Sequence, residues 1–403
     1  MKKNILCKVC VWSFICGIVF TATTAFAQQE IQLKPDVVYT VNLTKTAELN
    51  WIKEILATTE FKNFYDALTT KIDAEYDKAS KKFGFPTKLA DFLLKKVREV
   101  KEKEDISSKD VLEVFADQFE LIQVDAFVKK AYNDYLQQNT PSHEISGTTW
   151  VKQNIRVTFV VKFHPAELAG ITEYFEDAKG KIRFELIEPD TDNFLVKFSD
   201  PNEIFSVYAG GRKIENTDTY AVVFSGDRKF VEQKLNQLQN KNIQQFLFGE
   251  NAPAKWIRAE KSLFEVLKQV FQQEIQKKID NGGAGKDAKD VIRIIEQIEQ
   301  IESVDFITRD FNEKTGSQLQ ITLTSEKTAT NLKDLAEAGK VFLTFAAGSD
   351  NVDENGKKLL NLIINAEIKQ DGKILTALIN WSDDTSFEMI KQGLQDTAKK
   401  LKK

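Results

Sequence analysis

The chain has 403 residues, 42% of which are hydrophobic, and a formal net charge of −4 at pH 7. This length is enough for two or three domains, each with a core of its own. A mildly acidic chain without a basic block is a poor binder of nucleic acid, so we expect no nucleic-acid partner.

The first 27 residues have the three parts of a secretory signal peptide. Lys2 and Lys3 form a basic start, residues 5–20 are largely apolar, and Ala25-Phe26-Ala27 matches a cleavage motif. We therefore expect cleavage after Ala27, export to the periplasm or the extracellular space, and no membrane span in the mature chain. An uncleaved N-terminal anchor is an alternative, although the apolar run is short for a bilayer span.

The three cysteines of the chain, Cys7, Cys10 and Cys16, all lie in this segment. Cys16 leaves a lipoprotein signal as a further alternative, although Ile15 is a poor residue before a modified cysteine. Removing the three lysines of the segment from the 56 basic residues leaves 53 against 60 acidic ones, a net charge of −7. A mature chain without cysteine excludes disulfides, thiolate catalysis and cysteine-ligated metals.

The mature chain begins with a strand and a long helical region. Residues 31–43 predict a strand, and apolar residues recur at helical spacing from Thr46 to Phe83. A further helix is expected over residues 89–100, and residues 119–124 predict the next strand, which a helix follows.

Several strand–helix junctions in this chain match those of a known family. They are Leu33 to Tyr39 with Thr59-Glu60-Phe61, residues 111–115 before the strand at 119–124, and Tyr220 to Arg228. In these segments the chain resembles a family of uncharacterised exported bacterial proteins that has a Leu-Pro-Ala-Asp strand start.

The resemblance covers most of residues 31–403, and its motifs are structural junctions. Lys34 departs from the usual register of the strand start, and residues 250–290 depart further. The resemblance implies an envelope location and an α+β fold. It implies no activity, because the family is a domain of unknown function.

Residues 154–178 have the clearest pattern in the chain. The first half predicts a buried central strand, because both of its faces are apolar. The second half predicts a helix that begins at Pro165. Four more strands are expected at residues 182–187, 194–198, 204–208 and 220–224, with a loop at Gly210-Gly211 and a helix from Asp227.

Residues 242–302 read as helical, with Pro253 opening a helix that carries Trp256. The last third predicts strands at 304–311 and 318–323, and a helix from Glu326; a strand over 341–347 is the less favoured alternative.

A hairpin across Asp371-Gly372 is expected to pair Ile368 with Leu375 and Ala366 with Ala377. A final helix follows from Asp383. Because both halves share an order of strands, helix, hairpin and helix, we predict an α+β fold of duplicated units of antiparallel sheet packed with helices, plus helical inserts.

The predicted domains follow from this order. They are a signal peptide at 1–27, an N-terminal α+β domain at 28–241, a helical connector at 242–302 and a C-terminal α+β domain at 303–403.

Known catalytic and metal-binding patterns match the chain poorly. His143 and His164 are not in a metal-ligand spacing, and residues 282–287 lack the Ser or Thr that a phosphate loop needs. Residues 351–356 resemble the start of a calcium loop but lack its final Glu, which leaves weak calcium binding as an alternative. Asp190 and Asp192 form a close carboxylate pair without a partner acid.

We therefore predict no catalytic, cofactor-binding or metal residues, and no enzyme. The expected function is a non-catalytic binding or structural module of the envelope, whose partner would be another envelope protein. One alternative is a carrier of an apolar ligand such as a lipid, which the 29 phenylalanines suggest. The other is a hydrolase with dispersed carboxylates.

Overall fold

The computed structural model describes residues 34–83, 119–137, 154–162, 183–189, 193–199, 206–215, 217, 219–280, 298–311, 314–348, 357, 360–361, 363–380 and 384–402. The expected signal peptide, the helix at 89–100 and the helix from Pro165 lie outside these residues. The described chain has helices and antiparallel strands in two compact units, which confirms a mixed α+β fold.

The units interleave along the sequence. The first takes its described residues mainly from Phe115–Asn251, and the second from Asp36–Glu75 and Ala252–Lys403. The domain boundaries predicted above remain predictions.

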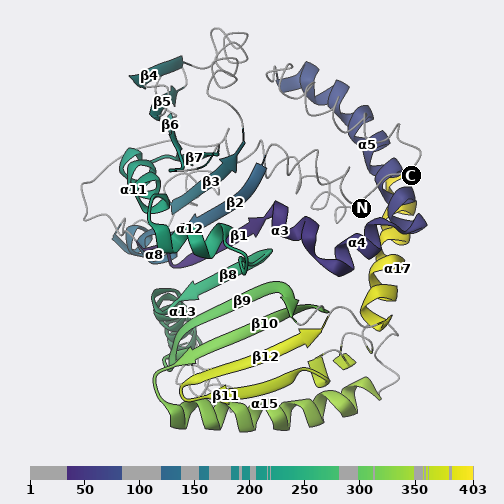
Figure 1. Cartoon of the computed structure of the whole chain (residues 1–403). Helices are drawn as coiled ribbons and strands as arrows, with labels where there is room; N and C mark the ends of the chain where they lie inside the picture. The colour runs from purple at the N-terminus through teal and green to yellow at the C-terminus, as the bar shows by residue number, and fades with distance from the viewer. Residues whose placement is uncertain are drawn as a thin grey trace. The chain divides into compact units, whose positions relative to one another are not determined.

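In the first unit, the described residues form six antiparallel strands, which Figure 1 shows. They are β2 (Phe119–Ala126), β3 (Ile155–Val161), β7 (Tyr220–Ser225), β6 (Ser206–Lys213), β5 (Asn193–Ser199) and β4 (Arg183–Pro189). Its helices are α8 (Val128–Gln137), α11 (Arg228–Leu238) and α12 (Lys241–Phe248). The predicted central strand at 155–161 is confirmed, since β3 lies between β2 and β7.

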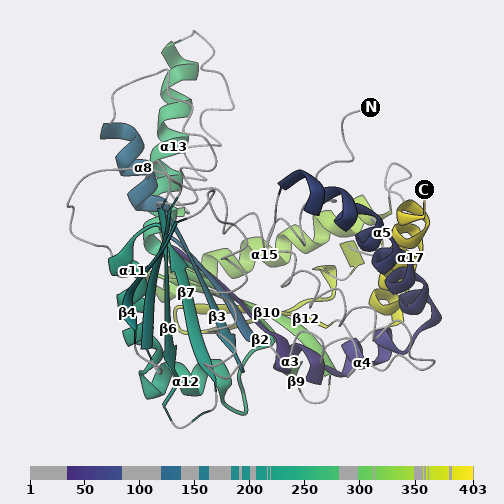
Figure 2. The same ribbon diagram turned by 90° about the horizontal axis from the view of Figure 1, so that it is seen from above.

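Helix α11 covers one face of this sheet, as Figures 1 and 2 both show. The helix begins where the sequence predicted, because the Asp227 side chain accepts a hydrogen bond from the Lys229 backbone N–H at 2.9 Å and caps it. Apolar residues from α11, α12 and the sheet then form the core: Leu121, Val160, Leu195, Ile214, Ala221, Val223, Val231, Leu235, Leu238 and Leu247.

Two glycines predicted to form a loop lie inside a strand. Gly210 and Gly211 belong to β6 and pair with Val223 and Val222 of β7, so the loop prediction is wrong. A β-carbon at Gly210 would collide with Val231 of α11, and one at Gly211 with Phe194. Glycine in this strand therefore reflects close approach of neighbouring groups.

The part of the second unit that the structure describes also has six antiparallel strands. They are β11 (Glu367–Asp371), β12 (Ile374–Asn380), β10 (Lys314–Leu323), β9 (Ile301–Phe311), β8 (Lys255–Glu260) and β1 (Val37–Asn42). Its helices are α3 (Leu43–Glu48), α4 (Asn50–Leu56), the start of α5 (Thr59–Phe83), α13 (Lys261–Asp280), α15 (Glu326–Ala347) and α17 (Asp384–Leu401).

Helix α15 packs on the sheet through one face, and it runs beside β11 in Figure 1. Ala329 and Leu332 of the helix contact a cluster that includes Leu323 and Leu375. The prediction of helix over 341–347 is confirmed, since α15 continues to Ala347.

The prediction that residues 242–302 are helical, with a helix opening at Pro253, is wrong at two places. Residues 255–260 form β8, and Ile301 begins β9; helix α13 starts only at Lys261. Strand β8 pairs with β1 on one side and β9 on the other, so both sides of its backbone have partners. These long-range hydrogen bonds override the local helical preference.

The hairpin exists, but its predicted register is wrong. Asp371 pairs with Ile374, which makes Gly372 and Lys373 the turn residues, and Ile368 pairs with Ala377. Gly372 has a φ of 54°, a conformation that favours glycine. The partner of Ala377 is therefore Ile368 and not the predicted Ala366, a shift of two residues. Because side chains along a strand alternate with a period of two, this shift leaves the same side chains facing the core.

Candidate functional site

One face of the sheet in the second unit is polar across four strands. Side chains alternate along β8, so Arg258 points to the face opposite Ile257. The register then aligns Arg258 with Asp305 of β9, Asp305 with Gln320 of β10, and Gln320 with Thr376 of β12. We call these four residues the polar row. All but Asp305 are half-buried, so the row is accessible in part.

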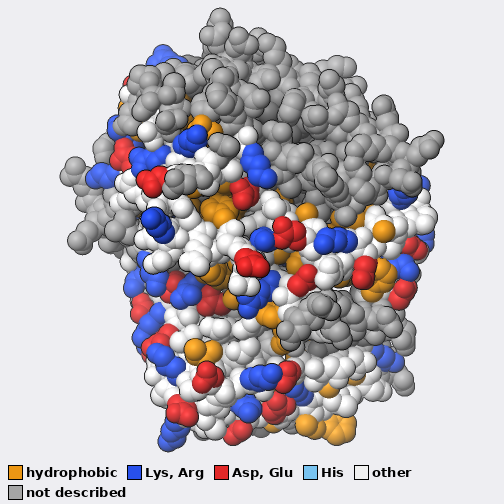
Figure 3. Space-filling model, viewed as in Figure 1, with side chains coloured by type: hydrophobic (Ala, Val, Ile, Leu, Met, Phe, Trp, Pro, Cys, Tyr) orange, Lys and Arg blue, Asp and Glu red, His pale blue; other side chains and the backbone are white. Residues whose placement is uncertain are grey.

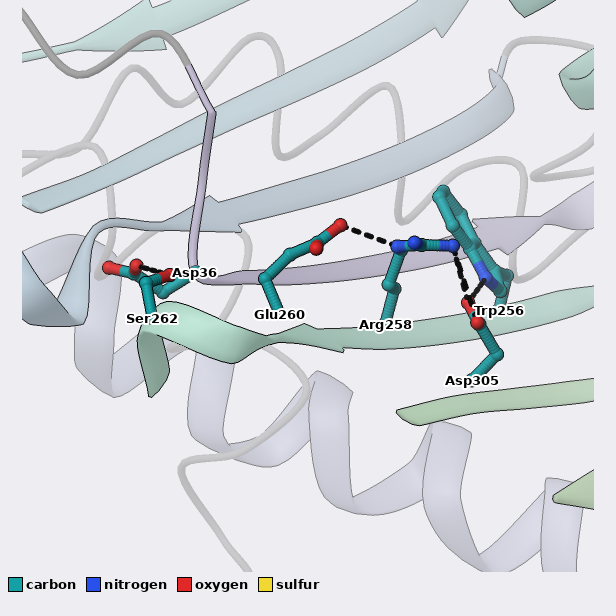
Figure 4. A network of polar contacts seen from close by, with 6 residues as sticks. All are labelled: Asp36, Trp256, Arg258, Glu260, Ser262 and Asp305. Atoms are coloured by element: carbon teal, nitrogen blue, oxygen red, sulfur yellow. Dashed lines mark hydrogen bonds and ion pairs between the residues drawn. The ribbon is translucent and has the colours of Figure 1, made fainter. Parts of the chain in front are cut away.

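Arg258 is held between two carboxylates, as Figure 4 shows. Its Nε donates to Glu260 Oε1 at 2.5 Å, and its Nη1 lies 3.3 Å from both carboxylate oxygens of Asp305. The side chain of Arg258 is 34% exposed, whereas those of Glu260 and Asp305 are 11% and 6% exposed. The two acids therefore form a buried support for a guanidinium whose outer edge meets solvent.

Trp256 binds the same aspartate beside Arg258. Its indole Nε1 donates to Asp305 Oδ1 at 2.9 Å. On β1, Thr40 is opposite Trp256, and within the described part of the chain its buried hydroxyl has no hydrogen-bond partner. The ring, the guanidinium and the carboxylate are thus held in one arrangement before anything binds.

A third carboxylate lies at the end of this network (Figure 4). Asp36 is fully buried and accepts a hydrogen bond from the Ser262 hydroxyl. Its backbone carbonyl accepts from the Glu260 N–H at 2.9 Å, which places the two acids side by side. Asp36 thus lies beyond Glu260 at the end of the network, and of the three acids it is Glu260 and Asp305 that contact Arg258.

The electrostatics of the network keep Arg258 charged. Partial burial alone would lower the pKa of its guanidinium, but hydrogen bonds and charge from Glu260 and Asp305 outweigh burial and raise that pKa. Such a group can hold a hydrogen-bond acceptor in place, and it does not exchange protons near neutral pH. The arrangement therefore suits recognition of a polar group.

Sequence reasoning missed this site because it assigned residues 255–260 to a helix. The available signal was the alternation of Trp256, Arg258 and Glu260 with two small or apolar residues, which is a strand pattern. The residues weighed from the sequence, His143, His164, Asp190, Asp192, 282–287 and 351–356, lie outside the described residues. Among the residues that are described, no three His, Cys, Asp or Glu side chains gather as a metal site would require.

The first unit holds a second polar cluster, which is fully enclosed. Asp125 of β2 and Arg156 of β3 are each 0% exposed, and Lys234 of α11 is 7% exposed. Asp125 Oδ2 accepts from Arg156 Nε at 2.7 Å and Nη2 at 2.5 Å, and it lies 3.1 Å from Lys234 Nζ. Gln123 Nε2 donates to the other oxygen of Asp125 at 2.7 Å.

Arg156 also joins the sheet to the helix above it. Its Nη1 donates to the Phe230 carbonyl of α11 at 3.1 Å, and its guanidinium carbon lies 5.3 Å from the centre of the Phe127 ring. The Phe127 and Phe230 rings stack at 4.4 Å. Because this cluster is enclosed, we assign it to the packing of α11 on the sheet.

The comparisons with known proteins give no family. No protein-family profile and no curated protein matches the chain. Among solved structures, crystal forms I, III and IV of TP0453 align over 89–91% of this chain and 93–100% of that chain, with 7–9% sequence identity and TM-scores of 0.32–0.33. Similarity at this level carries no conclusion about this chain.

No helix within the described ranges combines the length and the hydropathy that a membrane crossing needs.

Proposed function

We propose that this protein is an exported, non-catalytic binding module of the bacterial envelope, and that the polar face of the second unit is its binding surface. The observation that carries the proposal is the half-exposed guanidinium of Arg258 on a buried support of two carboxylates. The resemblance of the strand–helix junctions to exported proteins of unknown function supports the location.

The geometry favours a partner that presents hydrogen-bond acceptors. Arg258 uses Nε and Nη1 for Glu260 and Asp305, and no hydrogen bond from its Nη2 occurs among the described residues. Gln320 and Thr376 continue the row with an amide and a hydroxyl. A neutral carbonyl of another envelope protein fits this edge, because a planar guanidinium binds such a group with directed hydrogen bonds while Glu260 and Asp305 already balance its charge. Two similar six-stranded units support the further proposal that the scaffold is duplicated.

Crosslinking in the native envelope tests the binding surface. We expect a photoreactive residue at Gln320 to form a discrete protein adduct that Arg258→Gln reduces by about 10- to 100-fold, since a charged hydrogen bond contributes roughly 1.5–3 kcal/mol. Arg228→Gln is the matched control, because Arg228 pairs with Glu232 on the surface of α11 in the other unit. An adduct that survives Arg258→Gln, or is lost equally in the control, would contradict the proposal.

The intact mass of protein from the native envelope tests the proposed export. We expect a chain that begins at Gln28, since cleavage should follow Ala27. A full-length mass would show that the N-terminal segment is retained, and a chain that begins at a lipid-modified Cys16 would show a lipoprotein.

A carrier of an apolar ligand is the second candidate function. It is favoured by an apolar cluster on the face of the first sheet that α11 does not cover, where Phe159 and Phe224 meet edge to face at 5.8 Å beside Val161, Tyr220 and Val222. Native mass spectrometry of gently extracted protein should then show an added lipid mass, which Phe159→Ala reduces. A clean mass without ligand would count against this function.

A further inference from the structure

Strand β10 presents three polar side chains in succession on the face that carries Arg258. Gln318, Gln320 and Thr322 are two residues apart, so they point to the same side of the strand. The apolar residues between them point to the opposite side, where Ile321 packs on the cluster that α15 covers. We call Gln318, Gln320 and Thr322 the β10 triplet.

The two amides of the triplet are available to a partner. Within the described residues, neither side chain makes a hydrogen bond, and both are half-buried. Gln318 is between Ile307 of β9 and Leu378 of β12, which offer no polar side chain. Gln320 is beside Asp305, whose carboxylate already accepts the hydrogen bonds described above. An amide among apolar or occupied neighbours gains the most from a bound partner.

Strand β9 lies between the triplet and Arg258 and carries shorter side chains on this face. Ser303 and Asp305 are buried, whereas the side chain of Arg258 is 34% exposed and the two glutamines are half-buried. The middle of the face is therefore lined by short groups, with long hydrogen-bonding side chains along both of its borders.

The charges on this unit are balanced. Arg258 is matched by Glu260 and Asp305. In Figure 3, acidic and basic side chains of the described residues are interspersed over the strands that Figure 1 draws in its lower half, and they form no field of one sign. Attraction of a charged partner over a distance requires such a field. Recognition on this face therefore depends on short-range hydrogen bonds to neutral groups.

An extended polypeptide presents a pattern that matches these side chains. The N–H and C=O of one residue point to the same edge of an extended chain, and those of the next residue point to the other edge. Each edge therefore repeats one donor and one acceptor every two residues, or about 6.8 Å. Gln318 and Gln320 repeat at the same interval along β10, and each amide offers both an acceptor and a donor. One amide can thus exchange two hydrogen bonds with one residue of such a chain.

We infer that the partner of the polar face binds through an extended segment of its main chain that lies over β9. One edge of the segment meets the amides of Gln318 and Gln320, and the other edge presents a carbonyl to Nη2 of Arg258. The inference rests on the proposed function, because it names the part of the partner that the same surface takes. Since main-chain groups carry the contact, binding should tolerate many sequences.

Binding of a neutral model peptide to the full chain tests this inference. The probe is a capped heptapeptide of alternating serine and valine, and the side-chain amide signals of an isotopically labelled protein report its position. We expect the signals of Gln318 and Gln320 to shift at millimolar peptide. Methylating the backbone nitrogens of the peptide should weaken binding at least about fivefold, because its N–H donors are lost.

Gln318→Met should weaken binding of the unmethylated peptide by about fivefold, because it removes the amide and keeps a side chain of similar length. Methionine also suits the apolar neighbours Ile307 and Leu378, so the variant should unfold at a similar temperature. Gln392→Met is the matched control, since Gln392 is an exposed glutamine on α17 that donates to Asp396. It should leave binding unchanged.

Three results would overturn the inference. They are a peptide that shifts neither glutamine signal, equal binding of the methylated and unmethylated peptides, and a Gln318→Met variant that binds like the unmodified protein. A crosslink at Gln320 that still requires Arg258 would then leave the proposed function standing, with a folded surface as the partner. A crosslink that does not require Arg258 would contradict the proposed function itself.

Discussion

Replacing Asp125 by Asn should destabilise the first unit by about 3–5 kcal/mol, because it leaves two buried cations without their anion. Asp125 receives hydrogen bonds from both Gln123 and Arg156 and is paired with Lys234, all in the interior. Asn has the same shape, so the loss is one of charge. Hydrogen exchange of β3 and α11 at increasing urea concentration measures the change within this unit.

Lys234→Met is the control for this experiment. The Asp125–Arg156 pair is neutral by itself, and Lys234 adds a buried positive charge to it. Burial and the charge of Arg156 lower the pKa of the Lys234 ammonium more than Asp125 raises it. Removing this cation should change the free energy of unfolding by less than about 1.5 kcal/mol, with stabilisation the favoured sign. Equal losses in both variants would show that shape, and not charge balance, holds the cluster.

The pH dependence of the free energy of unfolding should separate the contribution of Asp125 from that of Lys234. Burial alone raises the pKa of Asp125, but Lys234, Arg156 and Gln123 together hold it below its ordinary value. The contribution of Asp125 to stability is then complete above the ordinary pKa of about 4 and is lost as the pH falls through its lower folded value. Asp125→Asn should therefore remove part of the acid-induced loss of stability.

Lys234 should affect the stability of the first unit at alkaline pH. Its pKa in the folded chain is lowered, so the unfolded chain binds more protons between that value and the ordinary pKa near 10.4. Stability should rise with pH across this window in the unmodified protein, and the rise should be smaller in Lys234→Met.

Gly210→Ala should destabilise the first unit by about 1–3 kcal/mol, because it overpacks the contact between β6 and α11. The added β-carbon would collide with Val231 Cγ1 and lie 2.9 Å from Leu235 Cδ1. Val231 is fully buried and branched at its β-carbon, so it cannot turn aside without moving the helix. Urea unfolding followed by hydrogen exchange of α11 measures the loss.

A glycine-to-alanine substitution in α17 should have the opposite effect on stability. Gly393 lies in the middle of this helix, and a β-carbon there meets nothing within 4 Å. Gly393→Ala should stabilise the second unit by up to about 1 kcal/mol, because alanine loses less conformational entropy in a helix. Destabilisation at both positions would refute the packing argument for Gly210.

Local patterns alone predicted much of the fold. The strand at 155–161 with its two apolar faces, the cap at Asp227 and the helix from Glu326 depend on residues close in the sequence, and the structure has all three elements. These features follow from local backbone geometry and from periodicity of 2.0 or 3.6 residues.

Three features depend on the tertiary structure. They are the strand conformation of β8, the position of Gly210 and Gly211 inside β6, and the two polar clusters around Arg258 and Asp125. Residues 255–260 become a strand because β1 and β9 provide hydrogen bonds on both sides, and those strands are distant in the sequence. Arg258 meets Asp305 for the same reason, and Arg156 meets Asp125 across two paired strands. A single sequence carries the side chains of these sites, but the pairing that brings them together is a property of the whole fold.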